Sequence, residues 1–150
     1  MHNLDLDIQT NTDASLLVQI GSGLLDGWNS HDVEKVMQYY APGYEGIDVG
    51  QANPLHGPDG KRTTVLLYLQ AFPDLHFEVE NTISQDNTIA VSWIASGTHR
   101  GSFMRIPPTG RQINVRGVSM LTIKDSMIVH AVYIWDVAGM LRNIGILPDL

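Results

Sequence analysis

The sequence predicts a single α+β domain in which helices come first and a run of hairpin-connected strands follows. Two observations favour this fold class. Apolar residues recur at helical spacing as far as Phe72, and from Leu75 onward they alternate with polar residues in the two-residue period of strands. Short polar turns separate the alternating segments, which favours an antiparallel sheet with the helices on one of its faces.

The helical part divides into three segments. A first helix is expected from a cap at Asp13, because apolar residues follow it at helical spacing. A second, shorter helix is expected after Ser30 and stops before Pro42, and residues 44–49 then form a short strand. A third helix is expected from Pro58, since proline suits the first turn of a helix.

Four strands are expected in the second half of the chain. The first two cover residues 75–79 and 89–95 and flank a turn at residues 85–87. The third covers residues 113–123, and a turn at residues 124–126 leads into the fourth. The fourth carries on one side Met127, Val129, Ala131, Tyr133 and Trp135. We expect the odd-numbered side chains of these last two strands to face an apolar hollow.

Composition and charge narrow the range of partners. The chain has 9 basic and 16 acidic side chains and a net charge of −7, and its basic residues form no cluster, so nucleic-acid binding is not expected. No apolar run is long enough to span a bilayer, so no membrane association and a cytoplasmic location are expected. The absence of cysteine excludes disulfides and thiolate chemistry.

We expect one domain over residues 1–150, with residues 1–12 as a candidate loose N-terminal arm. Ile128, Val132 and Ile134 form an apolar strip on the other side of the last strand. Sheets of this kind bury one face under helices, and a second subunit would cover the strip on the other. A homodimer is therefore expected.

Three motifs resemble those of one protein family. Gly-Thr-His-Arg-Gly at residues 97–101, followed by Pro-Pro-Thr-Gly-Arg at residues 107–111, resembles the strand-loop-strand signature of SnoaL-like polyketide cyclases. Residues 136–145 are similar to that family's closing Asp-x-x-Gly-x-Leu-x-x-Leu-Gly, and Trp-Asn-Ser-His-Asp at residues 28–32 resembles its first helical turn. The motifs follow the family's order and spacing over nearly the whole chain.

The resemblance implies the cone-shaped fold of the nuclear transport factor 2-like superfamily, a curved antiparallel sheet with the N-terminal helices packed over its concave face. It also implies a pocket for a hydrophobic small molecule and a cofactor-free intramolecular aldol condensation, in which an aspartate of the last strand serves as acid and base. In this chain the position of that aspartate holds Tyr133, and a histidine position of the third strand holds Ser119. The chain departs from the family's pattern at both positions.

Three residues are candidates for catalysis: His99, Tyr133 and Asp48. A phenol is a poor base at neutral pH, so Tyr133 would donate a hydrogen bond to a developing enolate, or else it is a core aromatic. His99 lies on the same strand side as Trp93 and is the best remaining base, or else it is a structural hydrogen-bonding residue. Asp48 lies where family members place ligand-facing residues, and a turn or surface role is its alternative.

The expected ligand-binding residues are Trp28, Tyr44, Trp93, Ser119, Trp135 and Asp136. The aromatic ones are core or pocket wall, two roles that look alike in a sequence. Asp136 directly precedes a short last helix closed by Gly145, so an N-cap is its simpler role. The histidines lack metal-binding spacing and no nucleotide-binding motif is present, so neither a metal nor a cofactor is expected.

Two functions therefore stay open. The first is a cofactor-free cyclase or isomerase acting on a polyketide-like or other polycarbonyl substrate. The second is a non-catalytic or regulatory binder of a hydrophobic small molecule on the same fold. A hydroxylating branch of the family is a third, which no residue singles out.

Overall fold

The computed structural model describes the backbone of residues 2–149 and the side chains of residues 14–149. Helices dominate the first half of the chain and strands the second, as predicted. In chain order the elements are α1 (His2–Asn29), α2 (Val33–Met37), β1 (Tyr40–Asp48), β2 (Leu55–His56), α3 (Gly57–Ala71), β3 (His76–Gln85), β4 (Thr88–Thr98), β5 (Gln112–Lys124), β6 (Met127–Trp135) and α4 (Val137–Asn143).

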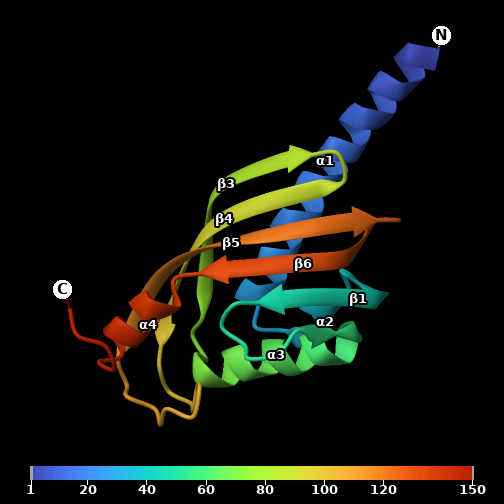
Figure 1. Ribbon diagram of the computed structural model, residues 1–150. Coiled ribbons are helices and arrows are strands. Elements are labelled where there is room, and N and C mark those ends of the chain that lie inside the picture. Colours follow the sequence, from blue (N-terminus) through green and yellow to red (C-terminus); the bar gives the residue numbers. More distant parts are fainter. Residues whose placement is uncertain (1, 150) are drawn as a thin grey trace.

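The strands form one six-stranded sheet in the order β2-β1-β6-β5-β4-β3 (Figure 1). The neighbours from β3 to β6 pair antiparallel, as predicted. β1 runs parallel to β6, because the chain leaves β1, crosses over through α3 and then passes through three hairpin strands before β6. The sheet is thus antiparallel apart from this pairing, which the sequence pattern did not indicate.

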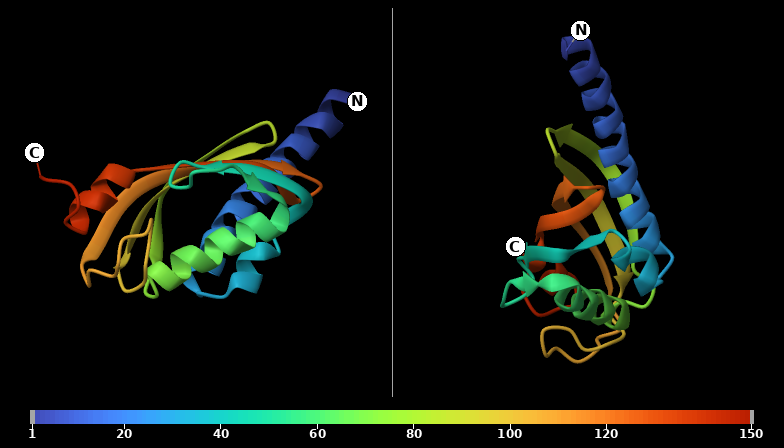
Figure 2. Two further views of the ribbon diagram at one scale, coloured as in Figure 1. Left: turned by 60° about the horizontal axis from the view of Figure 1, so that its bottom comes forward. Right: turned by 90° about the vertical axis from the view of Figure 1, so that its right-hand side faces the viewer.

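The sheet curves around the helices of the first half of the chain. Figure 2 shows α1 and α3 lying inside the curve, with α2 beside them. α1 packs against β3, α3 packs against β1, and α4 closes the far end of β5. This arrangement confirms the expected α+β fold with a curved sheet and helices over its concave face.

α1 is longer than predicted. It begins at His2 and passes through Asp13, which is therefore not its N-cap, and residues 2–12 continue the helix where a loose arm was expected. No proline or glycine occurs in residues 2–13, so nothing in this stretch breaks a helix. Its first turns extend beyond the sheet (Figure 1). None of the helices in residues 2–149 has both the length and the apolarity of a bilayer-spanning segment.

The second helix is capped by Asp32 and not by Ser30. The backbone N–H of Glu34 donates to Asp32 Oδ1 at 3.0 Å, which is the usual N-cap hydrogen bond. The Ser30 hydroxyl instead donates to the carbonyl of Gly27 at 2.6 Å, at the end of α1. β1 then begins at Tyr40, earlier than predicted, and this extension brings Tyr40 beside β6.

A register shift in the β5–β6 pair changes which side chains of β6 face the core. The shift lies between Thr122 and Ile123, and beyond it Ile128 turns inward and is fully buried. The prediction that Ile128 lies on the outer face is therefore wrong, because one extra residue in a strand reverses the direction of the side chains that follow. In the other half of β6 the predicted sides hold, with Tyr133 buried and Ile134 50% exposed.

Candidate active site

A cavity lies between the concave face of the sheet and helices α1 and α3. Its volume is about 70 Å³. Since one ordered water needs roughly 10–15 Å³, this space holds a few waters or one small carbonyl compound, and a polycyclic ligand requires the walls to move. The lining is mostly aromatic and aliphatic, and its charged side chains are Asp48 and Lys61.

The structure brings most of the predicted site residues together at this cavity. They come from α1, β1, β4, β5 and β6. Those that line it are Trp28, Asp48, Trp93, Ser119, Tyr133 and Trp135. Those that lie outside the lining are Tyr44, His99 and Asp136.

Three polar residues of the lining form a row across adjacent strands. Asp48 of β1 is the register partner of Tyr133 of β6, and Tyr133 is the partner of Ser119 of β5. Neighbouring strands lie roughly 5 Å apart, so these side chains are direct neighbours on the concave face. The row places a carboxylate, a phenol and a hydroxyl along one wall of the cavity.

The Asp48 carboxylate is held by three hydrogen bonds. Oδ1 accepts from the indole N–H of Trp135 at 2.9 Å and from the backbone N–H of Gly50 at 2.8 Å. Oδ2 accepts from the hydroxyl of Tyr68 at 2.8 Å. A carboxylate has about four acceptor positions, so one position remains on Oδ2 for a ligand. Asp48 is only 4% exposed, so its orientation is fixed within the protein interior.

Tyr133 belongs to a group of three buried phenols. Its hydroxyl lies 2.7 Å from that of Tyr40, and the hydroxyl of Tyr44 donates to it at 3.5 Å. Burial raises the pKa of Tyr133 well above its usual value, and the neighbouring phenols raise it further. Tyr133 is therefore protonated at neutral pH and can donate a hydrogen bond, but it cannot act as a base. Tyr44 supports it from behind the cavity wall.

Ser119 presents a hydroxyl hydrogen to the cavity. Its oxygen accepts from the indole N–H of Trp93 at 3.0 Å, and within the described residues the O–H has no acceptor. Gly117, the register partner of Trp93, makes room for this indole, because a Cβ there would lie 2.4 Å from the ring. Ser119 can therefore donate to a ligand oxygen.

Lys61 of α3 is a site residue that the sequence reasoning missed. It is 2% exposed and lines the cavity. The signal that could have found it is helical spacing, since Lys61 lies on the same face of α3 as Val65, Tyr68 and Phe72, at intervals of three and four residues. A charged side chain does not match the apolar pattern that marks the buried face of a helix.

Lys61 is surrounded by aromatic rings. Its Nζ lies 3.8 Å from the ring centroid of Tyr133, 5.5 Å from that of Tyr40 and 5.6 Å from that of Trp28, within cation–π range. Among the described residues it makes no hydrogen bond and no ion pair within 4.0 Å. Burial lowers the pKa of Lys61 from 10.5 to about 8, and the charge of Asp48 offsets part of this effect.

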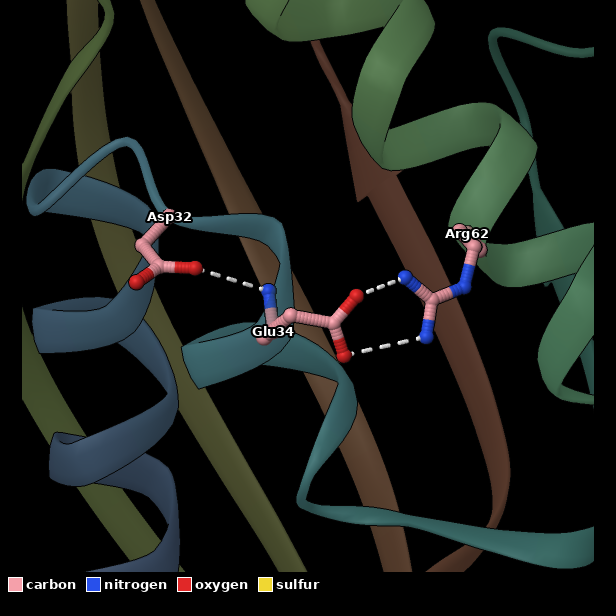
Figure 3. Close-up of polar contacts among 3 residues, drawn as sticks. All are labelled: Asp32, Glu34 and Arg62. Carbon is pink, nitrogen blue, oxygen red and sulfur yellow. Dashed lines mark hydrogen bonds and ion pairs between the residues drawn. The ribbon is translucent and has the colours of Figure 1, made fainter.

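The next residue along α3, Arg62, contacts α2 at the surface of the protein. The Arg62 guanidinium makes a two-pronged contact with the Glu34 carboxylate of α2, with Nη2 to Oε2 at 3.2 Å (Figure 3). Asp32 caps the same short helix. Successive residues of a helix point about 100° apart, so Arg62 contacts α2 at the surface while Lys61 lines the cavity.

His99 lies beyond the end of β4 and is not part of the cavity wall. Its Nδ1 accepts from the backbone N–H of Thr109 at 3.2 Å and lies 3.0 Å from the Thr109 hydroxyl. Its ring packs beside Phe72, with centroids 5.7 Å apart. The inward strand side predicted for His99 is correct, because it is fully buried, but these contacts hold the loop between β4 and β5.

Asp136 also lies outside the cavity. Its carboxylate accepts from the backbone N–H of Gly139 at 2.8 Å and caps α4, and Gly145 follows that helix with a φ of +86°. This is the N-cap role predicted as its simpler one, and the structure gives it no contact with the cavity.

Comparison with known proteins gives one family. The family model described as SnoaL-like polyketide cyclase matches residues 20–144. No curated protein sequence matches the chain.

Several solved structures share the fold. A candidate SnoaL-like polyketide cyclase from Jannaschia sp. CCS1 has a TM-score of 0.80 at 21% identity, over 89% of this chain and 94% of that one. IdmH, a candidate polyketide cyclase from Streptomyces antibioticus, has a TM-score of 0.75 at 26% identity, over 86% and 98%. AclR, a candidate hydroxylase from Streptomyces galilaeus, has a TM-score of 0.79 at 24% identity, over 89% and 83%. The expected fold of the ketosteroid isomerase and nuclear transport factor 2-like type is thereby confirmed.

Replacing Lys61 with methionine should stabilise the protein at neutral pH. Between pH 8 and 10.5 the unfolded chain binds more protons at this position than the folded one, since the folded pKa is about 8 and the ordinary value is 10.5. The cost of burying the ammonium is therefore complete below pH 8 and disappears as the pH rises toward 10.5. We expect Lys61→Met to raise the free energy of unfolding by about 1–3 kcal/mol at pH 7, and by less at pH 9.5.

Urea titrations at the two pH values measure this difference, and the exposed Lys35→Met serves as the matched control. Tyr40, Tyr133 and Asp48, the titratable groups that face Lys61, are present in both proteins and cancel in the comparison. A variant less stable than wild type at pH 7 would mean that the aromatic contacts outweigh the cost of burial.

Proposed function

Because the chain belongs to the SnoaL-like polyketide cyclase family, we propose that it catalyses a cofactor-free cyclisation or isomerisation of a polyketide-like carbonyl substrate. One observation carries the proposal. Asp48 is a buried carboxylate, oriented by three hydrogen bonds, that keeps an acceptor position beside an apolar cavity. A positioned carboxylate of this kind suits the removal of a proton from a carbon next to a carbonyl.

In the proposed reaction, Asp48 Oδ2 takes that proton and the electron pair moves to the carbonyl oxygen, giving an enolate. The hydroxyl of Ser119 and the protonated phenol of Tyr133 donate hydrogen bonds to this oxygen. The enolate carbon attacks a second carbonyl of the same chain, a carbon–carbon bond closes the ring, and Asp48 returns its proton to the new alkoxide. In an isomerisation no ring closes, and Asp48 instead returns its proton to a different carbon of the enolate.

The departure from the family's pattern supports this assignment. The family's aspartate on the last strand corresponds to Tyr133 here, and Asp48 is the register partner of Tyr133 on the adjacent strand. This chain thus has a carboxylate directly beside the position of the family's aspartate, on the neighbouring strand. His99 has no part in the proposed mechanism, because it lies outside the cavity wall.

The alternative function is binding without chemistry. Tyr133 and Ser119 occupy the two positions where the family's acid/base groups are expected, and a binder needs only the cavity. A protein that retains aryl ketones with micromolar affinity and leaves them unchanged, including their exchangeable protons, fits this alternative.

Replacement of Asp48 by asparagine should abolish proton abstraction while keeping the cavity. We expect the wild type to accelerate α-deuterium exchange of acetophenone in D₂O, and Asp48→Asn to slow that exchange by about 100-fold or more, because a general base contributes on the order of 10²–10⁴. Proton NMR follows the exchange, and ligand-observed NMR checks that the ketone still binds. The exposed Asp26→Asn is the matched control. Exchange at the wild-type rate in Asp48→Asn would remove Asp48 from the mechanism.

We also propose that the outer face of the sheet binds a second copy of the chain. Ile47 of β1 and Met120 of β5 both pair with Val132 of β6, and Ile134 lies further along that strand. Ile47, Met120 and Ile134 are 48%, 43% and 50% exposed, so four strand positions form one apolar patch on this face. In a twofold dimer this patch would pack against the same patch of the second copy.

Light scattering at micromolar concentration tests this proposal. We expect the mass of a dimer for the wild type, and that of a monomer for Ile134→Lys, since a lysine on each copy places two like charges in the interface. Ser22→Lys, an exposed position on α1, is the control that should remain dimeric. A monomeric wild type would contradict the proposal.

A further inference from the structure

Lys61 is the charged group of the cavity that the mechanism above leaves unused. We propose that Lys61 is a nucleophile that condenses with an aldehyde or ketone carbonyl of the bound ligand to form an iminium. The inference rests on the proposed carbonyl substrate and deepens the proposed function, because it assigns a covalent step to the same cavity.

The position of Lys61 supports this role. Its side chain lines the cavity and is almost completely buried, so a ligand in the cavity meets the amine without crossing solvent. Within the described residues, no carboxylate lies within ion-pair distance of its Nζ and no hydrogen-bond acceptor occupies it. A lysine kept only for structure normally has such a partner, because a buried unpaired ammonium is costly.

The surroundings also favour the neutral amine. Only a neutral amine has the lone pair that attacks a carbonyl, and desolvation in an apolar pocket is a known way to activate lysine. Burial lowers the pKa of Lys61 to about 8. At pH 7.5 roughly a quarter of such a lysine is neutral, against about a thousandth of an ordinary one.

The proposed step balances without an oxidant, a reductant or a cofactor. The lone pair of neutral Nζ attacks the carbonyl carbon, and the carbonyl electrons move to the oxygen to give a carbinolamine after proton transfer from nitrogen to oxygen. The hydroxyl takes a second proton and leaves as water, and the nitrogen lone pair forms the C=N⁺ bond. In total, one ketone and one lysine ammonium give one iminium and one water.

An iminium makes the chemistry of Asp48 easier. The positive nitrogen makes the hydrogens on the carbon α to the C=N⁺ bond more acidic, so Asp48 removes a proton from that carbon to give a neutral enamine in place of the enolate. The enamine carbon attacks the second carbonyl, and water then adds to the iminium and releases product and lysine. The proton that the leaving oxygen takes is the one released when the Lys61 ammonium becomes neutral. The phenol of Tyr133, whose ring centroid lies 3.8 Å from Nζ, and the hydroxyl of Ser119 can donate hydrogen bonds to that oxygen.

Reductive trapping tests the proposal on the intact chain. The protein has three lysines, and Lys35 and Lys124 are exposed, so they are internal controls for Lys61. Folded wild type is incubated with butanone and sodium cyanoborohydride at pH 7.5, and peptide mass mapping follows the alkylation of each lysine. We expect Lys61 to react at least about tenfold faster than the other two, because more of it is neutral.

The same protein unfolded in urea is the matched control, and there the three lysines should react at similar rates. This comparison needs no variant, so a folding defect cannot obscure it. Equal rates in the folded protein, or no alkylation of Lys61, would overturn the proposal.

Variants of Lys61 distinguish a nucleophilic role of this residue from a role as a positive charge only. Lys61→Arg keeps a cation and cannot form the iminium, so we expect acetophenone exchange to fall to the level of Lys61→Met, whereas Lys124→Arg behaves as wild type. Exchange retained in Lys61→Arg would assign Lys61 to charge stabilisation and refute the covalent role.

The inference and the proposed function can fail separately. Trapping at Lys61 without any exchange or cyclisation supports the iminium and removes the proposed catalysis. Exchange that depends on Asp48 but is unaffected in Lys61→Met supports the catalysis and removes the iminium.

Discussion

The cavity contains one amine, that of Lys61, which is buried without a hydrogen bond or an ion pair among the described residues. A charge in an apolar interior is costly, and here the rings of Tyr133, Tyr40 and Trp28 and the field of Asp48 offset only part of that cost. An apolar side chain at this position would pack with less penalty. A buried amine with no hydrogen-bond or ion-pair partner at the wall of a cavity is the pattern expected of a functional group.

The fold supplies what the amine needs. The curved sheet places Asp48, Tyr133 and Ser119 in a row on its concave face, and α3 brings Lys61 over that row from the opposite side. The Glu34–Arg62 contact joins α2 and α3 at the surface, and the absence of a side chain at Gly117 leaves room for the Trp93 indole in the cavity wall.

Much of this arrangement could be predicted from the sequence, because strand periodicity records which side chains share a face. Alternation placed Trp93, Ser119 and Tyr133 on the inner side, where the structure has them. The alternation gave the wrong side for Ile128, because a register shift between two strands leaves no mark in the alternation of apolar and polar residues. It could not place His99, which faces inward but lies past the end of the strand that would bring it to the cavity.

Lys61 was missed for a different reason: a charged residue on the inner face of a helix contradicts the pattern used to find that face, and such contradictions tend to mark functional positions. The most direct test is an NMR titration of the lysine side chains, in which Lys35 and Lys124 provide internal references. We expect a titration midpoint for Lys61 near pH 8, well below the ordinary lysine value of 10.5. A midpoint for Lys61 near 10.5 would contradict this expectation.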